Sequence, residues 1–423
     1  MGDEELLGPV GATLAAELER TDVVPSRREL FVVPAGEAYL AGNSLGLQPR
    51  AVRAAVDDVL ESWGGAGVAA HVEGAFPWAS YHETMRDSVA ALVGARPGEA
   101  VVMNSLTVNL HLLVNSFYRP RAERFRLVIE ADVFPSDRYA VMNVARARGF
   151  DPTAAVAILA PRDGERHLRT ADVEAFFAAE GQSVALVVLS AVDFRTGALL
   201  DIPAITAAAH RAGAVIAWDL AHAAGNVPLA LHDWDVDVAF WCHYKYVNAG
   251  PGAVGGAFVH ERHGRDPSIV RPGGWWGHDA ASRFAMPFEF VPLPGAEGWQ
   301  VSNPPILSMA PVRVSLALFH DVGLDALRAR SVRLTGFLER LLDAVAGRHP
   351  VELITPRDAT RRGAQLSVVV DDAVAVTERL YAEHRVRADD RPPNIIRLAP
   401  APLYNTYEDC WRAAGALDAV LSF

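Results

Sequence analysis

Four continuous apolar runs stand out in the middle of the chain: residues 125–131, 184–192, 214–221 and 237–243. Apolar runs without polar alternation are typical of strands buried on both faces, as in a parallel sheet covered by helices. Between two of these runs, residues 202–213 have the spacing of an amphipathic helix and end at a glycine. The order of strand, helix and strand predicts an α/β fold built from βαβ units.

The second half of the chain changes character after two proline- and glycine-rich stretches, residues 291–299 and 302–305. A long helical pattern over 324–345 follows, and then a strand pattern over 365–371. These features predict a second, smaller α+β domain. The predicted parts are an N-terminal segment that packs with the small domain (1–50), a large α/β domain (51–300) and the small domain (301–423).

Composition narrows the class of protein. A chain of 423 residues can hold one large and one small domain. The formal net charge of −12 disfavours nucleic acid and anionic membranes as partners. No apolar run has the length of a transmembrane helix, and the acidic N-terminus lacks a signal-peptide pattern. Only Cys242 and Cys410 are present, which argues against a disulfide framework or a cysteine-based zinc site. We expect a cytoplasmic enzyme without a metal site.

Lys245 is the only lysine in the chain. The sequence has 39 basic residues of the two types, so 39 − 1 = 38 of them are arginines. A guanidinium stays protonated, whereas a lysine amine can lose its proton and condense with an aldehyde to form a Schiff base. Its neighbours Trp241, Cys242, Tyr244 and Tyr246 are not typical of an exposed site. We therefore favour a chemical role over a surface lysine left by a biased codon supply.

Polar and aromatic residues follow the predicted strands at their carboxyl ends, which is where ligands bind in open α/β sheets. Because the carboxyl ends of parallel strands share one edge of the sheet, we expect these side chains to converge. They are Phe134 and Asp137 after the first run, Ser190 at the end of the second, Asp219 and His222 after the third, and Tyr244 and Lys245 after the fourth.

This set of residues fits pyridoxal phosphate. The cofactor needs an amine for its aldehyde, a carboxylate for its pyridine nitrogen and a flat side chain for its ring, which Lys245, Asp219 and Phe134 can supply. Residues 104–117 are predicted to form a helix whose first turn offers backbone amides and the Thr107 hydroxyl to the phosphate. Helix caps at Asp219 and Thr107 and a core histidine at position 222 are the plainer interpretations. The joint position of these residues favours the cofactor and leaves the reaction open.

The chain resembles the kynureninases, which are pyridoxal-phosphate enzymes of the aspartate-aminotransferase fold. This resemblance implies fold type I, with a large, mostly parallel seven-stranded sheet domain and a small α+β domain. The matching stretches occur in the family's order along nearly the whole chain. They are YLAGNSLGLQPR (39–50), NSLTVNLHLL (104–113), FPSDRYA (134–140), WDLAHAAGNVPLALHDWDVDVAFWCHYKYVNAGPG (218–252), GGWWGH (273–278), SNPPIL (302–307) and IIRLAPAPLYN (395–405).

The resemblance also implies residue roles. Lys245 would bind the cofactor and move protons, Asp219 would pair with the pyridine nitrogen, and Tyr244 would assist later proton transfers. The remaining cofactor-binding residues would be Leu106, Thr107, Phe134, Ser136, Asp137, Ser190, His222, Trp275 and Asn303. The substrate-binding residues would be Ser44, His71, Trp276, Asn303 and Arg397, of which Arg397 would bind the α-carboxylate in a bidentate manner.

The implied reaction is hydrolysis of L-kynurenine or 3-hydroxy-L-kynurenine, through a quinonoid and a ketimine, to anthranilate or 3-hydroxyanthranilate and L-alanine. A homodimer with active sites at the subunit interface is implied as well. One alternative is a related pyridoxal-phosphate enzyme that acts on a ring-substituted kynurenine or another amino acid. A non-catalytic binding protein on the same fold is a second alternative, which the intact set of Lys245, Asp219 and Arg397 disfavours.

Two positions depart from the family pattern. His243 stands where the family usually has serine, and Arg195 stands where it usually has an aromatic residue. One interpretation is that the two form a compensating pair, and the other is that they alter the substrate pocket. His71 and Asn303 resemble the pair found in members that favour 3-hydroxykynurenine.

Overall fold

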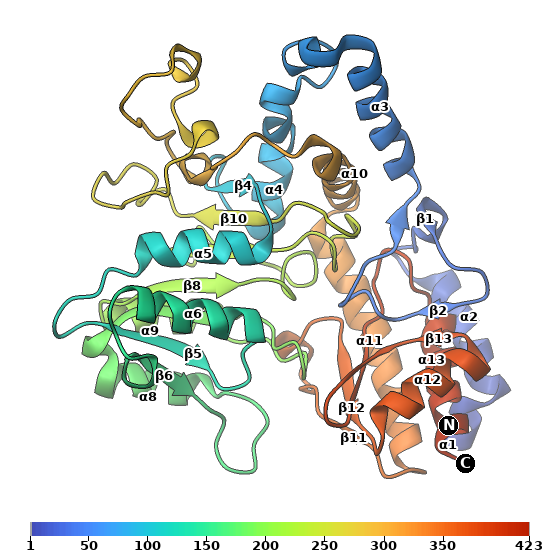
Figure 1. Ribbon diagram of the computed structural model, residues 1–423. Coiled ribbons are helices and arrows are strands. Elements are labelled where there is room, and N and C mark those ends of the chain that lie inside the picture. The colour runs from blue at the N-terminus through green and yellow to red at the C-terminus, as the bar shows by residue number, and fades with distance from the viewer. Residues whose placement is uncertain (1, 423) are drawn as a thin grey trace.

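A seven-stranded sheet lies at the centre of the larger part of the computed structural model, which describes residues 2–422 (Figure 1). The strand order is β4-β10-β9-β8-β7-β5-β6. The strands from β9 to β6 in this order are parallel, and β10 is antiparallel to both of its neighbours. The bounds are β4 (Ala100–Val102), β5 (Arg126–Glu130), β6 (Val156–Leu159), β7 (Val184–Ser190), β8 (Val215–Asp219), β9 (Val238–Trp241) and β10 (Gly256–Val259). The mostly parallel sheet predicted from the apolar runs is confirmed.

Helices cover both faces of this sheet, which explains the continuous apolar runs. In β7, Leu186 and Val188 pack into one core together with α5 and α6, whereas Val187 and Leu189 pack into another with α8 and α9. Both sets of alternating side chains are therefore buried. The helices are α5 (Leu106–Phe117), α6 (Pro135–Ala147), α7 (Pro152–Ala155), α8 (Thr170–Glu180) and α9 (Ile202–Arg211).

Three further helices complete the larger part. The helix α10 packs against α3 and α4, and all three contribute to one hydrophobic core with the sheet. Their bounds are α3 (Ala51–Ala66), α4 (Arg86–Val93) and α10 (Ile306–Val322). Among the described residues, no single helix is long and apolar enough to span a bilayer. The pair of α10 and α11 (Leu324–Ala346), bent by 82°, passes that test only when taken together.

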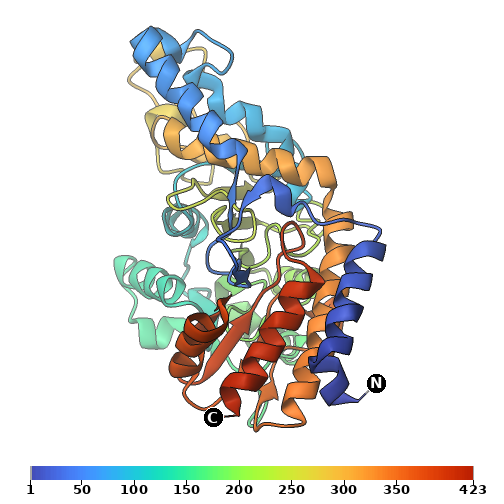
Figure 2. The same ribbon diagram turned by 90° about the vertical axis from the view of Figure 1, so that its right-hand side faces the viewer.

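The smaller part is built on a four-stranded antiparallel sheet of order β11-β12-β15-β14. The N-terminal helix α2 lies beside α13, and α13 lies beside α11, so both chain ends belong to this part (Figure 2). The elements are α1 (Asp3–Leu7), α2 (Pro9–Thr21), α12 (Ala373–His384), α13 (Tyr407–Leu421), β11 (Glu352–Leu353), β12 (Leu366–Val369), β14 (Asp389–Arg391) and β15 (Ile395–Leu398).

Short elements join the two parts. The strands β1 (Phe31–Val32) and β3 (Gln48–Pro49) pair with each other, and β2 (Ala38–Tyr39) pairs with β13 (Val386–Arg387). The 3₁₀ helices are Arg28–Leu30, Gly67–His71, Trp78–Met85, Gly181–Ser183, Trp275–Gly277, Arg283–Ala285, Ala296–Trp299 and Ala359–Arg361.

The hydrophobic cores show which segments pack together. Leu6 and Ala38 pack with the small sheet, whereas Phe31 and Leu47 pack with the large one. The N-terminal segment therefore contributes to both cores. Residues of α10 lie in the core of the large sheet, although they follow position 301. The three ranges given above for the domains stay a prediction.

Candidate active site

The strand register brings the predicted strand-end residues to one edge of the sheet. Ser190, the last residue of β7, lies directly opposite Asp219, the last residue of β8. Asp219 in turn lies opposite Phe240 in β9, and the chain continues from β9 into Tyr244 and Lys245. The parallel register therefore places the carboxylate and the amine at the same edge, beyond the carboxyl ends of the strands.

Lys245 contacts His222 at this edge. The Lys245 Nζ lies 3.1 Å from the His222 Nε2 and 5.8 Å from the centre of the Tyr244 ring. Burial, the charge of Lys245 and the charge of Arg397 hold the pKa of His222 well below its usual range, so the imidazole is neutral. Because the amine donates to Nε2, the imidazole proton is on Nδ1. That nitrogen is buried and has no partner within the described part of the chain.

Asp219 and Asp137 form a buried pair of carboxyl groups. The backbone N–H of Ala221 donates to Asp219 Oδ1 over 2.7 Å, and the Ser136 hydroxyl donates to Asp137 Oδ1 over 3.2 Å. Burial raises the pKa of both groups, and the neighbouring Asp219 charge raises that of Asp137 further. The Ala221 N–H and the charge of Lys245 favour the ionised form of Asp219. The pair therefore carries its charge on Asp219 and its proton on Asp137.

Glu130 is a third buried carboxyl group here, and it was not among the predicted site residues. It is the last residue of β5, and its Oε1 accepts a hydrogen bond of 3.1 Å from the backbone N–H of Ser190. Burial raises the pKa of Glu130 to about 7. The rule that selected Asp219, an acid at the end of an apolar strand, would have selected Glu130 as well.

Phe134 lies at the N-terminus of α6, where its ring is partly exposed. It packs edge-on against Phe194, with 5.3 Å between the ring centres. The carbonyl of Phe194 accepts hydrogen bonds from Arg397 Nη1 (2.7 Å) and from Gln365 Nε2 (3.1 Å). The aromatic residue expected to cover the cofactor is thus connected through Phe194 to the arginine expected to bind the substrate.

Arg397 is fully buried in β15 of the small sheet. Its Nε donates to Asp389 Oδ1 over 2.6 Å, and its Nη2 donates to the other oxygen of the same carboxylate. With the bond from Nη1 to Phe194, three of the five guanidinium N–H groups are occupied. One N–H on each of Nη1 and Nη2 remains for a carboxylate.

The N-terminus of α5 offers an anion site. Ser105 is the extended residue before the helix, and its side chain makes no capping hydrogen bond. The first backbone amides, from Leu106 and Thr107 onward, have no partner inside the helix and can bind an anion. A Cβ atom at Gly255 would lie 3.0 Å from the Leu106 nitrogen, so a glycine there lets the loop come close to these amides.

Not all of the predicted site residues lie near Lys245. The loop of Ser44 does, because the backbone N–H of Gly46 donates to the Tyr244 carbonyl over 2.8 Å. Four other predicted site residues either contact residues outside the Lys245 site or lie at the surface. His71 packs on Trp78 with 5.2 Å between ring centres, Trp276 is buried under Arg283, and Trp275 and Asn303 are exposed.

Arg195 and His243, the two departures from the family pattern, do not form a pair. The Arg195 Nη1 lies 2.9 Å from Asp132 Oδ1 at the surface. His243 is fully buried, and its ring lies 2.8 Å from Trp241 Nε1 and 2.6 Å from the Val254 carbonyl. The hypothesis of a compensating pair is therefore wrong, because each residue has its own partner.

The residues present at this edge fit pyridoxal phosphate. The buried His222 Nδ1 lacks a partner among the described residues, which is expected where a polar ligand binds. A single amine, an ionised carboxylate, an aromatic ring and a helix N-terminus supply the four contacts that the cofactor needs.

Comparison with solved structures identifies the fold. An apo cysteine desulfurase from Thermococcus onnurineus NA1 is similar with a TM-score of 0.76 at 16% identity, covering 94% of this chain and 97% of that one. A variant of the cystine C–S lyase C-DES, with glycine covalently linked to its PLP cofactor, has a TM-score of 0.76 at 18% identity, covering 92% and 98%. The fold is that of the fold type I pyridoxal-phosphate enzymes, and this prediction is confirmed.

Comparison of sequences is more specific. Residues 327–417 match the family model described as the kynureninase C-terminal domain. A protein named kynureninase from Salinispora tropica is 56% identical over 430 residues, covering 100% of this chain and 99% of that protein. The chain belongs to the kynureninase family, as the motifs predicted.

Proposed function

We propose that the protein is a pyridoxal-phosphate-dependent hydrolase that cleaves L-kynurenine, its 3-hydroxy form or both into L-alanine and the corresponding anthranilate. The position of Lys245 is the observation that carries this proposal. The only lysine of the chain contacts the neutral His222 at the edge of the sheet where the buried Asp219 ends β8. Full-length relatives named kynureninase support the choice of reaction.

The residues of the chain have distinct tasks in this reaction. When bound, the cofactor would supply an aldehyde and an electron-withdrawing ring. Asp219, the ionised member of its pair, would hold a proton at the pyridine nitrogen. Lys245 would hold the aldehyde until the substrate amine displaces it, and the freed Nζ would then accept the α-proton of the substrate. Burial raises the pKa of Tyr244, so its phenol stays protonated at neutral pH and is available as a proton donor.

Arg397 binds the α-carboxylate of the substrate through its remaining Nη1 and Nη2 N–H groups. Asp389 and the Phe194 carbonyl hold the guanidinium plane in place from the other side. Because Arg397 is fully buried, the small domain has to move away from the large one to admit the substrate. The contact of Phe194 with both Arg397 and Phe134 then links closure over the carboxylate to the position of the cofactor ring.

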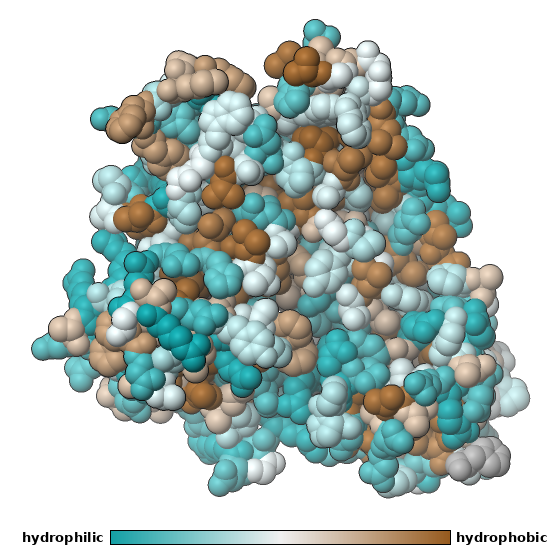
Figure 3. Space-filling view, in the orientation of Figure 1, coloured by the Kyte–Doolittle hydropathy of each residue, from teal (hydrophilic) through white to brown (hydrophobic). Residues whose placement is uncertain are grey.

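A homodimer completes the site in this proposal. Apolar side chains gather on the upper part of the molecule, over α3 and over the segment that follows β10 (Figure 3). Exposed apolar patches of this kind mark interaction surfaces. Trp275 is part of this exposed surface. In a dimer formed through the surface, Trp275 of one subunit would lie near Lys245 of the other. The exposed residues include Trp63, Val68, Val72, Trp275, Phe284, Met286 and Phe288.

The test is turnover by the purified, cofactor-loaded protein. L-Kynurenine and 3-hydroxy-L-kynurenine are incubated separately, and alanine and the two anthranilates are quantified by mass spectrometry. Alanine in a 1:1 ratio with the matching anthranilate is expected for at least one substrate, and a Lys245→Met protein is the negative control. Protein that binds the cofactor but releases no alanine from either substrate would contradict the proposed reaction and leave the fold assignment intact.

A further inference from the structure

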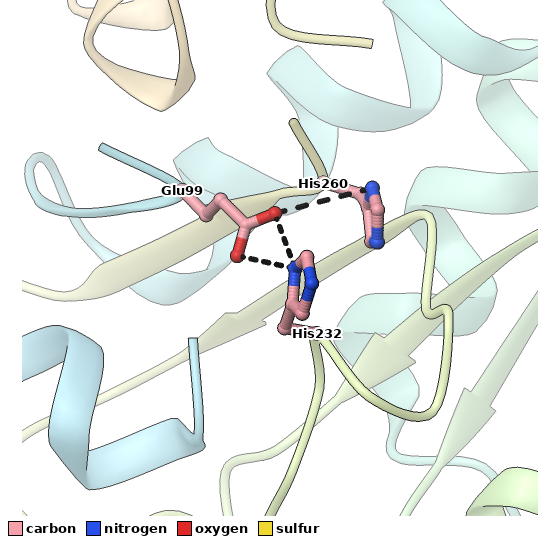
Figure 4. A group of neighbouring side chains, drawn as sticks. All are labelled: Glu99, His232 and His260. Atoms are coloured by element: carbon pink, nitrogen blue, oxygen red, sulfur yellow. Dashed lines mark hydrogen bonds and ion pairs between the residues drawn. The ribbon is translucent and has the colours of Figure 1, made fainter. Parts of the chain in front are cut away.

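Two histidines and a glutamate meet at the opposite end of the large sheet from Lys245. Glu99 directly precedes β4, His232 lies in the loop before β9, and His260 directly follows β10 (Figure 4). The strand β9 runs from the loop of His232 toward Lys245, so its length separates this cluster from the candidate active site. None of the three residues takes part in the proposed reaction.

The distances within the cluster suit a shared metal ion. The His232 Nδ1 lies 3.0 and 3.1 Å from the two Glu99 carboxylate oxygens, and the His260 Nδ1 lies 3.9 Å from Glu99 Oε1. One ligand atom from each residue lies within 4.8 Å of the others. Ligands of a tetrahedral ion with bonds of about 2.1 Å are separated by about 3.4 Å, which falls inside this range. The His232 and His260 rings are stacked, with 4.9 Å between their centres and 13° between their planes, so one ring has to rotate before both Nδ1 atoms can face the same ion.

The ring of His260 has the tautomer that a metal ligand needs at Nδ1. Its Nδ1 accepts a 3.2 Å hydrogen bond from the backbone N–H of Arg262, so this nitrogen carries a lone pair and not a proton. The opposite nitrogen, Nε2, lies 3.5 Å from Asp235 Oδ1. A carboxylate at the far nitrogen is what commonly orients metal-binding histidines. An ion at Nδ1 would replace the contact with Arg262.

The carboxylate of Glu99 is held in position by the backbone. The N–H groups of Arg96 and Glu261 each donate to one of its oxygens over 2.8 Å. The side chains of Glu99 and His260 are buried, whereas that of His232 is 16% exposed and leaves a route from solvent. The cluster thus combines a fixed anionic ligand with an imidazole that can exchange its Nδ1 proton for a metal ion.

We propose that Glu99, His232 and His260 form a binding site for a divalent transition metal ion, with Zn²⁺ as the best match. Two imidazoles and one carboxylate, with water as a fourth ligand, are a common ligand set for this ion. The bound ion would join the segments before β4, before β9 and after β10. Its role is to stabilise the antiparallel edge of the sheet, independently of turnover at Lys245.

The proposal is tested by titrating the metal into untagged, chelator-treated, cofactor-loaded protein. Binding of one equivalent of Zn²⁺ per chain is expected by calorimetry, and Co²⁺ should give visible absorption bands of a low-coordinate site. His260→Gln and Glu99→Gln should abolish this stoichiometric binding. Asp235→Asn, which removes the charge at His260 Nε2 and also that of the ion pair with Arg262, should weaken it roughly 10–100-fold. Thermal unfolding of the wild-type protein should shift to a higher temperature with Zn²⁺.

His320→Gln is the matched control, because His320 is exposed on α10 and lies outside the cluster. This variant should bind Zn²⁺ like the wild-type protein. The proposal is overturned if the wild-type protein binds no stoichiometric Zn²⁺, or if the cluster variants bind it as tightly as His320→Gln does. Should Glu99→Gln fail to fold, His232→Gln and His260→Gln decide the question, with circular dichroism as the check on folding.

Discussion

The Lys245 Nζ lies 3.1 Å from the His222 Nε2, and this contact determines how both groups can act. His222 cannot accept a charge there, because it is buried beside Lys245 and within the field of Arg397. It therefore accepts a hydrogen bond from the amine and does not compete with it for a proton. The histidine orients the amine at the edge of the sheet, and its own Nδ1 is buried without a partner among the described residues.

Lys245→Arg should abolish turnover although it conserves the positive charge. A guanidinium cannot form the covalent bond with the cofactor aldehyde, and it is too basic to remove the α-proton. The variant should lose the visible absorption of lysine-bound cofactor after gel filtration and should release no alanine from kynurenine. Far-UV circular dichroism that matches the wild-type protein serves as the folding control. Turnover by this variant would refute the assignment of Lys245.

Asp219→Asn tests the charge on the carboxyl pair. The amide oxygen can still accept the hydrogen bond of Ala221, so the local geometry is conserved, while the negative charge beside the pyridine nitrogen is lost. Loss of a charge aligned with the reacting centre should lower kcat by about 10²–10³-fold. The thermal unfolding midpoint should not fall, because a buried charge is removed. A wild-type kcat would contradict the role of Asp219.

The residues at the carboxyl edge of the large sheet could be predicted from the sequence, because short stretches of the chain determine where each strand ends. Ser190 and Asp219 are the last residues of strands that are buried on both faces. The apolar run shows where each strand lies, and the first polar residue after the run shows where it ends. Glu130 follows the same rule, but the residues predicted from its run were Phe134 and Asp137, which lie further along the chain. The family motifs then identified the reaction, which strand ends alone leave open.

The remaining features depend on contacts between distant segments. Asp389 binds Arg397 across two antiparallel strands, and Asp132 binds Arg195 across the sheet edge, yet no spacing in the sequence indicates either pair. The metal cluster joins Glu99 to His232 across 133 positions. Such contacts follow from strand order and register, which a single sequence does not determine.

Arg397→Lys should raise KM more than it lowers kcat. A lysine cannot bind Asp389 and the Phe194 carbonyl while it also presents two parallel N–H groups to the substrate. Loss of a charge-assisted contact should weaken substrate binding by about 1.5–3 kcal/mol. Steady-state kinetics with kynurenine measure this effect, and a substrate analogue lacking the α-carboxylate should show no difference between the two proteins. An unchanged KM would rule out the carboxylate contact.

Glu130→Gln should change how stability depends on pH. Burial raises the pKa of Glu130 from an ordinary value of 4.5 to about 7, so the folded protein retains a proton that the unfolded chain releases. Stability from this group is complete below pH 4.5 and is lost as the pH rises to about 7. The difference of 2.5 pH units (7 − 4.5) corresponds to roughly 3 kcal/mol.

Glutamine resembles the protonated carboxyl group in shape and can accept the hydrogen bond from the Ser190 N–H, but it has no charge to bury at high pH. Glu130→Gln should therefore match the wild-type protein near pH 4.5 and exceed its stability at pH 8. Urea unfolding midpoints at the two pH values measure the effect. Glu123→Gln is the control, because Glu123 is exposed and its substitution should leave the wild-type pH dependence unchanged.

Equal pH dependence in the Glu130 variant and the wild-type protein would show that Glu130 is already ionised at neutral pH. In that case the hydrogen bonds from Ser190 would lower the pKa of Glu130 as much as burial raises it.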